Sequence, residues 1–317
     1  MGIQLVTGVA GFVGSHLAEQ LLDMGHEVRG VDCFTPYYDG AMKRSNMARL
    51  LSSKRFDFVE LDLRRGDLGP LLRDVSAVFH QAAQPGVRLS WAEQFTEYAS
   101  CNIEATQRLL EAARTHPIDR FVYASSSSVY GNAAHYPTTE TDVPLPFSPY
   151  GVTKLAAEHL CGLYASNYGT PTVSLRYFTV YGPRQRPDMA MHRLIEAALD
   201  DLPFPLYGDG SHVRDFTFVD DIVAANVAAA TAPVTPGTVL NICAGGSTTM
   251  REVIDGVMGA VGRPLRVDRR PEQPGDVHRT GGDNARARES LQWQPQVQLP
   301  EGIAAQVEWH RSARARS

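Results

Sequence analysis

Short apolar runs and amphipathic segments alternate along the first two thirds of the chain. The apolar run from Ile3 to Thr7 ends in a glycine-rich turn, and the residues that follow place Leu17, Leu21 and Leu22 on one face of a helix. Strands that alternate with helices predict a parallel, doubly wound α/β sheet. The pattern predicts further strands at 27–31, 56–61, 77–80, 120–124, 172–176 and 239–243, and helices at about 91–116, 150–168 and 219–230.

The turn after the first strand carries Gly8, Gly11 and Gly14, each three residues from the next. Glycines allow a tight turn there and a close approach of the backbone to a pyrophosphate at a helix N-terminus. Asp32, at the end of the second strand, would accept hydrogen bonds from a ribose diol and repel a 2′-phosphate. A glycine turn without a ligand is the alternative, but the order of strand, turn, helix, strand and acid favours a Rossmann-type site for NAD over NADP.

Tyr150 and Lys154 lie four residues apart at the start of a predicted helix, on one face and one turn apart. An ammonium and a positively charged nicotinamide both favour the phenolate, which can then act as a base on a sugar hydroxyl. This spacing also occurs on many solvated helix faces, so its meaning depends on the nucleotide site before it. The run Ser125 to Ser128 follows a strand at the sheet edge that binds ligands, although such a turn can also cap itself.

Composition narrows the class of partner. The chain has 317 residues, enough for one large domain or two smaller ones, and a net charge of −5. This mildly acidic balance argues against nucleic acid and anionic membranes, and no apolar run approaches the ~20 residues that span a bilayer. Four scattered cysteines without a Cys-x-x-Cys pair predict reduced thiols, a cytoplasmic location and no metal site, and the ten histidines show no ligand spacing.

The glycine spacing, together with Tyr150 and Lys154, resembles the extended short-chain dehydrogenase/reductase superfamily in its nucleotide-sugar branch, over essentially the whole chain. The resemblance implies a tightly held NAD, a UDP-sugar substrate, a homodimer, and a catalytic Ser126 that bridges the sugar O4 and Tyr150. In that branch, 4,6-dehydratases carry Asp-Glu and UDP-glucuronate decarboxylases carry a Glu where this chain has Ser127 and Ser128. Elimination needs a general acid and base that these hydroxyls do not supply, which leaves epimerisation.

The segment from Thr179 is similar to UDP-glucuronate 4-epimerases, with Thr-Val-Tyr-Gly-Pro and then Arg-Pro-Asp-Met from Arg186. Pro36–Asp39 and Pro85–Arg88 agree, and Gln273 stands where UDP-glucose enzymes usually have an arginine. The expected activity is therefore NAD-dependent C4 epimerisation of UDP-glucuronate to UDP-galacturonate through a 4-keto intermediate. The alternatives are a UDP-glucose or UDP-N-acetylglucosamine 4-epimerase, and a catalytically silent regulator that senses NAD(H).

The residues expected at the site fall into three groups. The catalytic group is Ser126, Tyr150 and Lys154. The cofactor group is Gly8, Gly11, Phe12, Val13, Gly14, Asp32, Asp62, Leu63, Gln81, Ala82, Ala83, Asn102, Ser125, Tyr150, Lys154, Tyr177 and Val180. The substrate group is Arg88, Ser126, Ser127, Ser128, Tyr150, Thr179, Arg186, Leu206, Tyr207, Arg214 and Asp276.

Within the substrate group, Ser127, Ser128 and Thr179 are expected to hold the sugar carboxylate, with a contribution from Arg186. Arg214 lies in a predicted strand, glycine turn and strand at 206–216 and would clamp the diphosphate, the alternative being a surface hairpin with an ordinary salt bridge. The predicted NAD-binding domain is 1–180, completed by about 217–243. Residues 181–216 and 244–317 are expected to form a smaller mixed α/β domain that binds the UDP-sugar.

Overall fold

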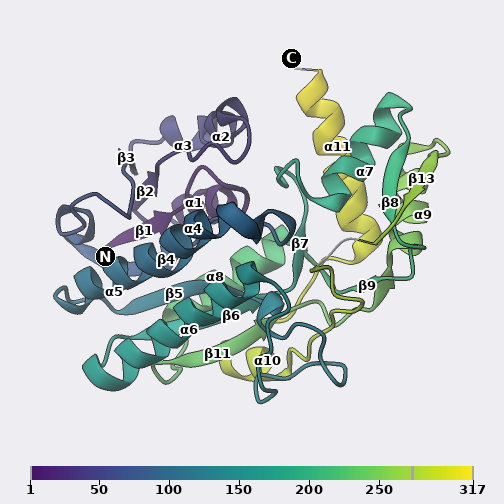
Figure 1. Cartoon of the computed structure of the whole chain (residues 1–317). Helices are drawn as coiled ribbons and strands as arrows, with labels where there is room; N and C mark the ends of the chain where they lie inside the picture. Colours follow the sequence, from purple (N-terminus) through teal and green to yellow (C-terminus); the bar gives the residue numbers. More distant parts are fainter. Residues whose placement is uncertain (1, 273–274, 316–317) are drawn as a thin grey trace.

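A parallel sheet of seven strands lies at the centre of the computed structural model, which describes residues 2–272 and 275–315 (Figure 1). The strand order is β11-β6-β5-β4-β1-β2-β3, so the direction of winding reverses between β1 and β4. This confirms the predicted doubly wound sheet. The strands are β1 (Ile3–Thr7), β2 (Val28–Asp32), β3 (Phe56–Glu60), β4 (Val75–His80), β5 (Arg120–Ser126), β6 (Thr172–Tyr177) and β11 (Thr238–Ile242).

Helices cover both faces of this sheet (Figure 1). Helices α1 (Phe12–Asp23) and α8 (Val219–Thr231) pack together on one face, and α5 (Ala105–Arg114) and α6 (Pro149–Tyr168) pack together on the other. Helix α6 begins where the sequence predicts, because the Ser148 side chain accepts a hydrogen bond from the backbone N–H of Gly151 at its N-terminus. Tyr150 and Lys154 therefore lie in its first two turns.

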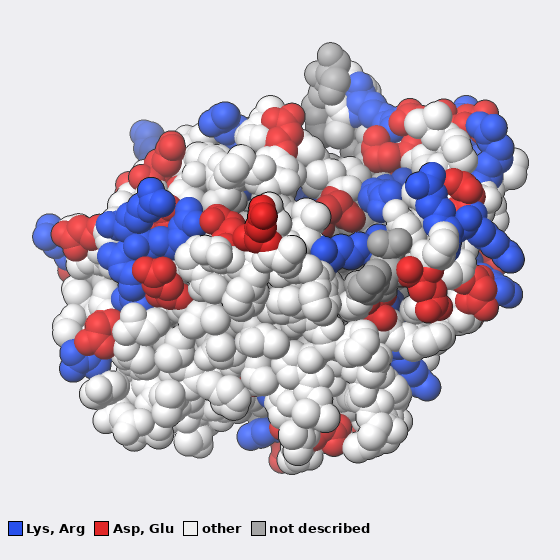
Figure 2. Space-filling view, viewed as in Figure 1, with Lys and Arg blue, Asp and Glu red and all other residues white. Residues whose placement is uncertain are grey.

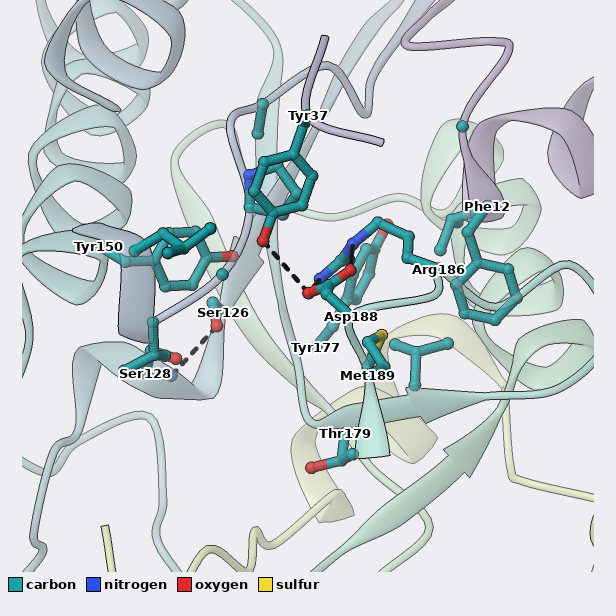
Figure 3. Close-up of a pocket in the computed structure, with 18 of the residues that line it drawn as sticks. Phe12, Tyr37, Ser126, Ser128, Tyr150, Tyr177, Thr179, Arg186, Asp188 and Met189 are labelled. Carbon is teal, nitrogen blue, oxygen red and sulfur yellow. Dashed lines mark hydrogen bonds and ion pairs between the residues drawn. The ribbon is translucent and has the colours of Figure 1, made fainter. Parts of the chain in front are cut away.

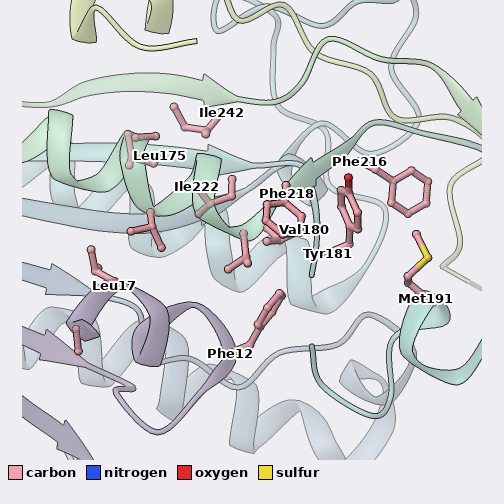
Figure 4. Packing of buried hydrophobic residues seen from close by; sticks show 14 of the residues in the cluster. Phe12, Leu17, Leu175, Val180, Tyr181, Met191, Phe216, Phe218, Ile222 and Ile242 are labelled. Carbon is pink, nitrogen blue, oxygen red and sulfur yellow. The ribbon is translucent and has the colours of Figure 1, made fainter. Parts of the chain in front are cut away.

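Neighbouring residues of a strand pack into opposite cores, because their side chains point to opposite faces of the sheet. In β1, Val6 joins the core under α1 and α8, and Leu5 joins the core under α5 and α6. The first core continues beyond the sheet, where the Tyr181 ring packs edge-on against Phe216 and Phe218 at centroid distances of 6.0 and 5.5 Å (Figure 4). One apolar core thus joins the sheet to the smaller layer beside it.

The smaller layer lies beyond the carboxyl ends of the sheet strands and consists of strand pairs and helices (Figure 1). Its strand pairs are β7 (Thr179–Tyr181) with β10 (Phe216–Phe218), β8 (Phe204–Tyr207) with β13 (Val267–Arg270), and β9 (Val213–Arg214) with β12 (Thr248–Thr249). Its helices are α7 (Ala190–Asp200), α9 (Met250–Val261) and α11 (Leu299–Arg314). The short helices α2 (Gly40–Asn46) and α3 (Ala48–Leu51) follow β2, and α10 (Ala285–Leu291) packs near β11. The proposed domain boundaries stay predictions.

The strands predicted within 206–216 form. They do not make the surface hairpin that was the alternative, because β8 pairs with β13 and β9 with β12. The predicted helix 91–116 is not uniform: a 3₁₀ turn at Ala92–Gln94 and helix α4 (Phe95–Tyr98) lead into a π-type stretch, Ala99–Glu104, before α5. Such stretches often occur at functional sites. Within the described residues, no helix is long and apolar enough to cross a membrane. Gln273 lies outside the described residues.

Candidate active site

A cavity of about 890 Å³ lies at the carboxyl edge of the sheet, between the glycine turn and the smaller layer (Figure 3). This volume is within the range of roughly 300–1,000 Å³ that is usual for ligand pockets. The cavity is lined by every residue expected at the site except Asn102. The structure therefore brings together residues from strand ends far apart in the sequence, as the switch-point rule for open α/β sheets predicts. The individual roles of these residues stay predictions.

The glycine turn packs too closely to hold side chains. Gly8 has a φ of +68°, and a Cβ on it would lie 2.8 Å from the backbone nitrogen of Ala82. A Cβ on Gly14 would lie 2.2 Å from the Gly8 carbonyl oxygen. Helix α1 can therefore start against the end of β1, with residues 11–14 lining the cavity where helix N–H groups favour a phosphate.

Asp32 is held in place at the other end of the cofactor part of the cavity. Its carboxylate accepts hydrogen bonds from the backbone N–H groups of Ala10 and Phe34, at 3.1 and 2.9 Å. Each oxygen keeps a lone pair for a ribose hydroxyl. The glycine turn and Asp32 together fit a dinucleotide with an unmodified adenosine ribose, as in NAD. Lys43, which sequence reasoning missed, lines the cavity nearby and donates to the Thr35 carbonyl at 2.7 Å.

Lys154 is almost fully buried, with an exposed fraction of 3 %. Its Nζ lies 4.6 Å from the centroid of the Tyr123 ring, which gives the ammonium a cation–π contact. Burial lowers the pKa of Lys154 to about 7, although Cys161 and Glu158 oppose the change. The lysine is therefore close to losing its charge at neutral pH, and groups that bind in the cavity will affect that balance.

The Arg186 guanidinium lies close enough to the Tyr150 phenol to lower its pKa. Burial raises the pKa of Tyr150, while the Arg186 guanidinium and the Ser126 hydroxyl lower it and Asp188 raises it further. The Lys154 ammonium lies against the Tyr123 ring, and the role expected for it in favouring the phenolate stays a prediction.

Arg186 is itself held by an acidic partner on the side of the cavity that faces Tyr150 (Figure 3). Its Nε donates to Asp188 Oδ1 at 3.0 Å, and the Tyr37 hydroxyl donates to Asp188 Oδ2 at 3.2 Å. The Tyr37 oxygen also packs against Gly86, where a Cβ would lie only 2.3 Å away. Tyr37 and Asp188 lie in the motifs Pro36–Asp39 and Arg-Pro-Asp-Met, but the sequence predicts no role for either of them. The cluster connects the loop after β2 with the loop before α7, across the cavity.

Some hydroxyls of the serine run at the end of β5 are hydrogen-bonded within the protein, and others are not. The Ser125 hydroxyl donates to Glu158 at 2.6 Å, and the Ser126 oxygen accepts from the Ser128 backbone N–H at 3.1 Å. The alternative, a turn whose serines bond its own backbone, therefore holds for Ser126. Among the described residues, the hydroxyls of Ser127, Ser128 and Thr179 have no hydrogen-bond partner, although all three residues line the cavity. Three free donors therefore line the same cavity as Tyr150.

Arg88 contacts two other residues of the substrate group, Asp276 and Tyr207. Arg88 donates to Asp276 Oδ2 at 2.7 Å, and its guanidinium lies 4.4 Å from the centroid of the Tyr207 ring. Arg214 donates to the Val277 carbonyl at 2.7 Å, so it holds the loop that carries Asp276. The segment Gly86–Arg88 from the sheet domain thus reaches the smaller layer at the mouth of the cavity.

Two buried asparagines, neither of which lines the cavity, hold residues at or next to its wall through hydrogen bonds. Asn102, in the π-type stretch, accepts from the Gln84 backbone N–H at 2.7 Å and donates to Thr153 at 2.9 Å, next to Lys154. It therefore supports the catalytic helix and does not line the cavity. Asn226, on α8, accepts from Gln81 and from Tyr177, at 2.9 Å each. Nothing in the sequence marks Asn226, because its partners lie far from it in the chain.

Comparisons with known proteins agree with this geometry. The model of the NAD dependent epimerase/dehydratase family matches residues 4–243. The chain is 43% identical to an uncharacterized UDP-glucose epimerase, YtcB, of Bacillus subtilis (strain 168), and the match covers 96% of each chain. The UDP-glucuronic acid 4-epimerase from Bacillus cereus, in complex with UDP-glucuronic acid and NAD, aligns with a TM-score of 0.95 and 41% identity over 98% of this chain and 99% of that one. MoeE5 in complex with UDP-glucose and NAD aligns with a TM-score of 0.89 and 40% identity over 100% of both chains, and another MoeE5 structure holds UDP-glucuronic acid.

The lowered pKa of Lys154 predicts a pH-dependent stability of the cofactor-free protein. The pKa falls from 10.5 to about 7 on folding, so between these values the unfolded chain binds more protons and the free energy of unfolding rises with pH. Replacing Lys154 with Met removes this dependence. We expect Lys154→Met to be more stable than the wild type at pH 7, on the order of 3 kcal/mol, with the difference shrinking towards pH 10. Urea denaturation across this range measures it, and a difference that is constant with pH would contradict it.

Proposed function

Because the chain belongs to the NAD dependent epimerase/dehydratase family, we propose that it inverts C4 of UDP-glucuronate to give UDP-galacturonate. The glycine turn, Asp32 and Lys154 would hold NAD, which supplies the hydride acceptor and donor for C4. Tyr150 removes the O4 proton with Ser126 beside it, and Arg186 stabilises the phenolate. The sugar then presents its other face, and Tyr150 returns the proton. The reaction has no net redox change.

The free hydroxyls of Ser127, Ser128 and Thr179 are the observation that favours a sugar with a carboxylate as the substrate. Hydrogen bonds from hydroxyls to an ionised carboxylate are stronger than those to a neutral group. A 4-keto glucuronate is also a β-keto acid, which loses CO₂ when its C5–C6 bond lies perpendicular to the carbonyl plane. Donors that fix the carboxylate away from this orientation would let epimerisation proceed without decarboxylation. The bond to C6 must stay intact, and no acid stands at positions 127 and 128 to promote elimination.

A neutral UDP-sugar is the second candidate substrate, and two observations favour it. The chain resembles a protein named as a UDP-glucose epimerase, and MoeE5 holds UDP-glucose in one structure. Hydroxyls also bind neutral hydroxymethyl groups, and the charge of Arg186 is already balanced by Asp188. The acidic and the neutral UDP-sugar undergo the same chemical steps at C4. Selection between them therefore depends only on the protein groups that contact the C6 substituent.

We also propose that the protein is a homodimer joined through α5 and α6. The face over α6 is largely free of charged side chains (Figure 2). Val152 and Leu163 of α6 are 48% and 54% exposed, and Phe147 before the helix is 48% exposed. Exposed apolar side chains along α6 favour packing against a second copy of the same face. The four cysteines are free thiols, in line with the predicted cytoplasmic location, which stays a prediction.

Turnover of matched UDP-sugars tests the function. Protein purified without added NAD is expected to convert UDP-glucuronate to UDP-galacturonate, with a kcat/KM at least roughly tenfold above that for UDP-glucose, because ionic hydrogen bonds are the stronger ones. Tyr150→Phe should lower kcat by about 10²–10⁴-fold, the usual contribution of a general base. Chromatographic separation of the C4 epimers measures both. A preference for UDP-glucose would support the neutral-sugar epimerase, and no turnover of any UDP-sugar would support an NAD(H)-sensing regulator.

Replacing the three free hydroxyls tests the role given to them. In the variant Ser127→Ala/Ser128→Ala/Thr179→Ala, we expect slower epimerisation and a larger share of the decarboxylated UDP-4-pentosulose. Each lost hydrogen bond to a charged group costs about 1.5–3 kcal/mol. Ser125→Ala is the matched control, since the Ser125 hydroxyl bonds Glu158 and should leave the product ratio unchanged. Product analysis by mass spectrometry measures the ratio, and an unchanged ratio in the triple variant rejects this role.

Sedimentation tests the dimer. A charge at the centre of an apolar interface is costly to bury, so Leu163→Asp should weaken dimerisation at least roughly tenfold. Leu202→Asp is the matched control, because Leu202 is also exposed, at 56%, but lies just after α7 and away from α6. Analytical ultracentrifugation over a concentration series measures the dissociation constant. A monomeric wild type, or equal effects of the two substitutions, would argue against this interface.

A further inference from the structure

Two buried histidines join α7 to α11, outside the lining of the active-site cavity. The imidazole rings of His192 and His310 have centroids 4.5 Å apart and planes 74° apart. Both are buried, and the His310 side chain is only 2% exposed. Glu196 lies one turn after His192 on α7, and these three residues offer ligand atoms within 4.8 Å of one another. Side chains of metal-ligand type thus converge from two helices, although no sequence spacing revealed them.

The hydrogen bonds of each ring determine which nitrogen carries a proton. His192 Nδ1 lies 2.7 Å from the Gln185 carbonyl oxygen, which can only accept, so this nitrogen is the donor. His310 Nδ1 lies 2.5 Å from Glu196 Oε1, a carboxylate oxygen, and is the donor there. In both neutral rings, the lone pair is therefore on Nε2.

Neither Nε2 atom is used by the protein. His310 Nε2 is buried and has no hydrogen-bond partner among the described residues, and His192 Nε2 has none in the same part of the chain. Buried polar atoms are nearly always paired, so an orphaned nitrogen needs an explanation. A protonated Nε2 on His310 would still lack an acceptor. A ligand that accepts electron density from the lone pairs resolves this deficit.

The surrounding groups are those of a metal site. Histidines that bind a metal through one nitrogen almost always donate the other N–H to a carbonyl or carboxylate, as His192 and His310 do. The nearby charges also favour a cation: the Arg314 guanidinium pairs with both Glu196 and Asp200, at 2.6 Å each, which leaves one negative charge in excess.

We propose that His192 and His310 bind a divalent transition metal through their Nε2 atoms, with Glu196 orienting His310. Imidazole nitrogens suit Zn²⁺, Ni²⁺ and Cu²⁺, and bind Zn²⁺ at about 2.0–2.1 Å. Water would complete the coordination, since the two imidazoles supply only two of the ligands. The ion would link α7 and α11. It would also restrain the active-site loop, because His192 bonds Gln185 through both its ring and its backbone N–H, and Gln185 precedes Arg186.

A second cluster of similar composition provides the matched control. His212, Glu272 and His278 also offer atoms close together, but the two rings stack at 4.7 Å with planes only 16° apart. The lone pairs of stacked rings lie in parallel planes and do not point at a common centre. His278 and Glu272 are exposed as well, so this cluster offers a weaker site.

Zinc retention by the full-length protein tests the proposal. Protein treated with a chelator, loaded with ZnCl₂ and desalted is expected to retain about one equivalent of zinc and to melt at a higher temperature than the metal-free form. His192→Gln and His310→Gln should each weaken Zn²⁺ binding at least roughly tenfold and remove the rise in melting temperature, and Glu196→Gln should weaken binding roughly 10–100-fold through the lost orientation of His310. His278→Gln should retain both properties.

The following results would overturn the proposal. A wild type that retains no zinc, or retention that survives His192→Gln and His310→Gln, excludes the buried pair as the site. Loss of zinc in His278→Gln alone assigns the metal to the exposed cluster. If His310→Gln does not fold, as judged by its circular dichroism in the absence of metal, His192→Gln and Glu196→Gln still decide between these outcomes.

Discussion

The buried ion pair between Glu158 and Arg176 fixes the position of the catalytic helix on the sheet. The Arg176 guanidinium makes two hydrogen bonds to the Glu158 carboxylate, at 2.6 and 3.0 Å, and both side chains are only 4% exposed. Ser125 donates to the same carboxylate at 2.6 Å. A buried pair needs such complete hydrogen bonding to offset its desolvation. Because Glu158 lies one turn after Lys154, this pair sets how Lys154 faces the ends of β5 and β6.

Each buried cation in the cavity lies beside its own anion or aromatic ring. This pairing affects how readily the Tyr150 phenol can ionise. Lys154 lies against Tyr123 with a lowered pKa, while Arg186 lowers the pKa of Tyr150 and is itself restrained by Asp188. A fully buried cation without a partner would be costly, so each one has an anion or an aromatic ring beside it. Bound cofactor and substrate add charges of their own, and the phenol can ionise only when their sum favours the phenolate.

The sequence predicts the sheet, the cavity lining and the catalytic helix well, because these depend on local signals. Strand periodicity, the glycine spacing and the Tyr150–Lys154 interval are all readable within a few residues. What it does not predict depends on contacts between distant segments. The Asn226 amide reaches Gln81 and Tyr177 only after the chain has folded, and the strands within 206–216 choose partners on other segments. The π-type stretch around Asn102 likewise follows from packing, since its residues fit an ordinary helix.

Residues of the substrate group contact one another across the cavity. Arg88 occupies both the carboxylate of Asp276 and the face of the Tyr207 ring. A ligand that stacked on the same face of Tyr207 and bonded the same oxygen of Asp276 would have to displace the Arg88 guanidinium. The free energy of the broken contacts would then subtract from its binding free energy. The measured affinity for such a ligand would then be the difference between the free energy of the contacts it forms and that of the Arg88 contacts it breaks.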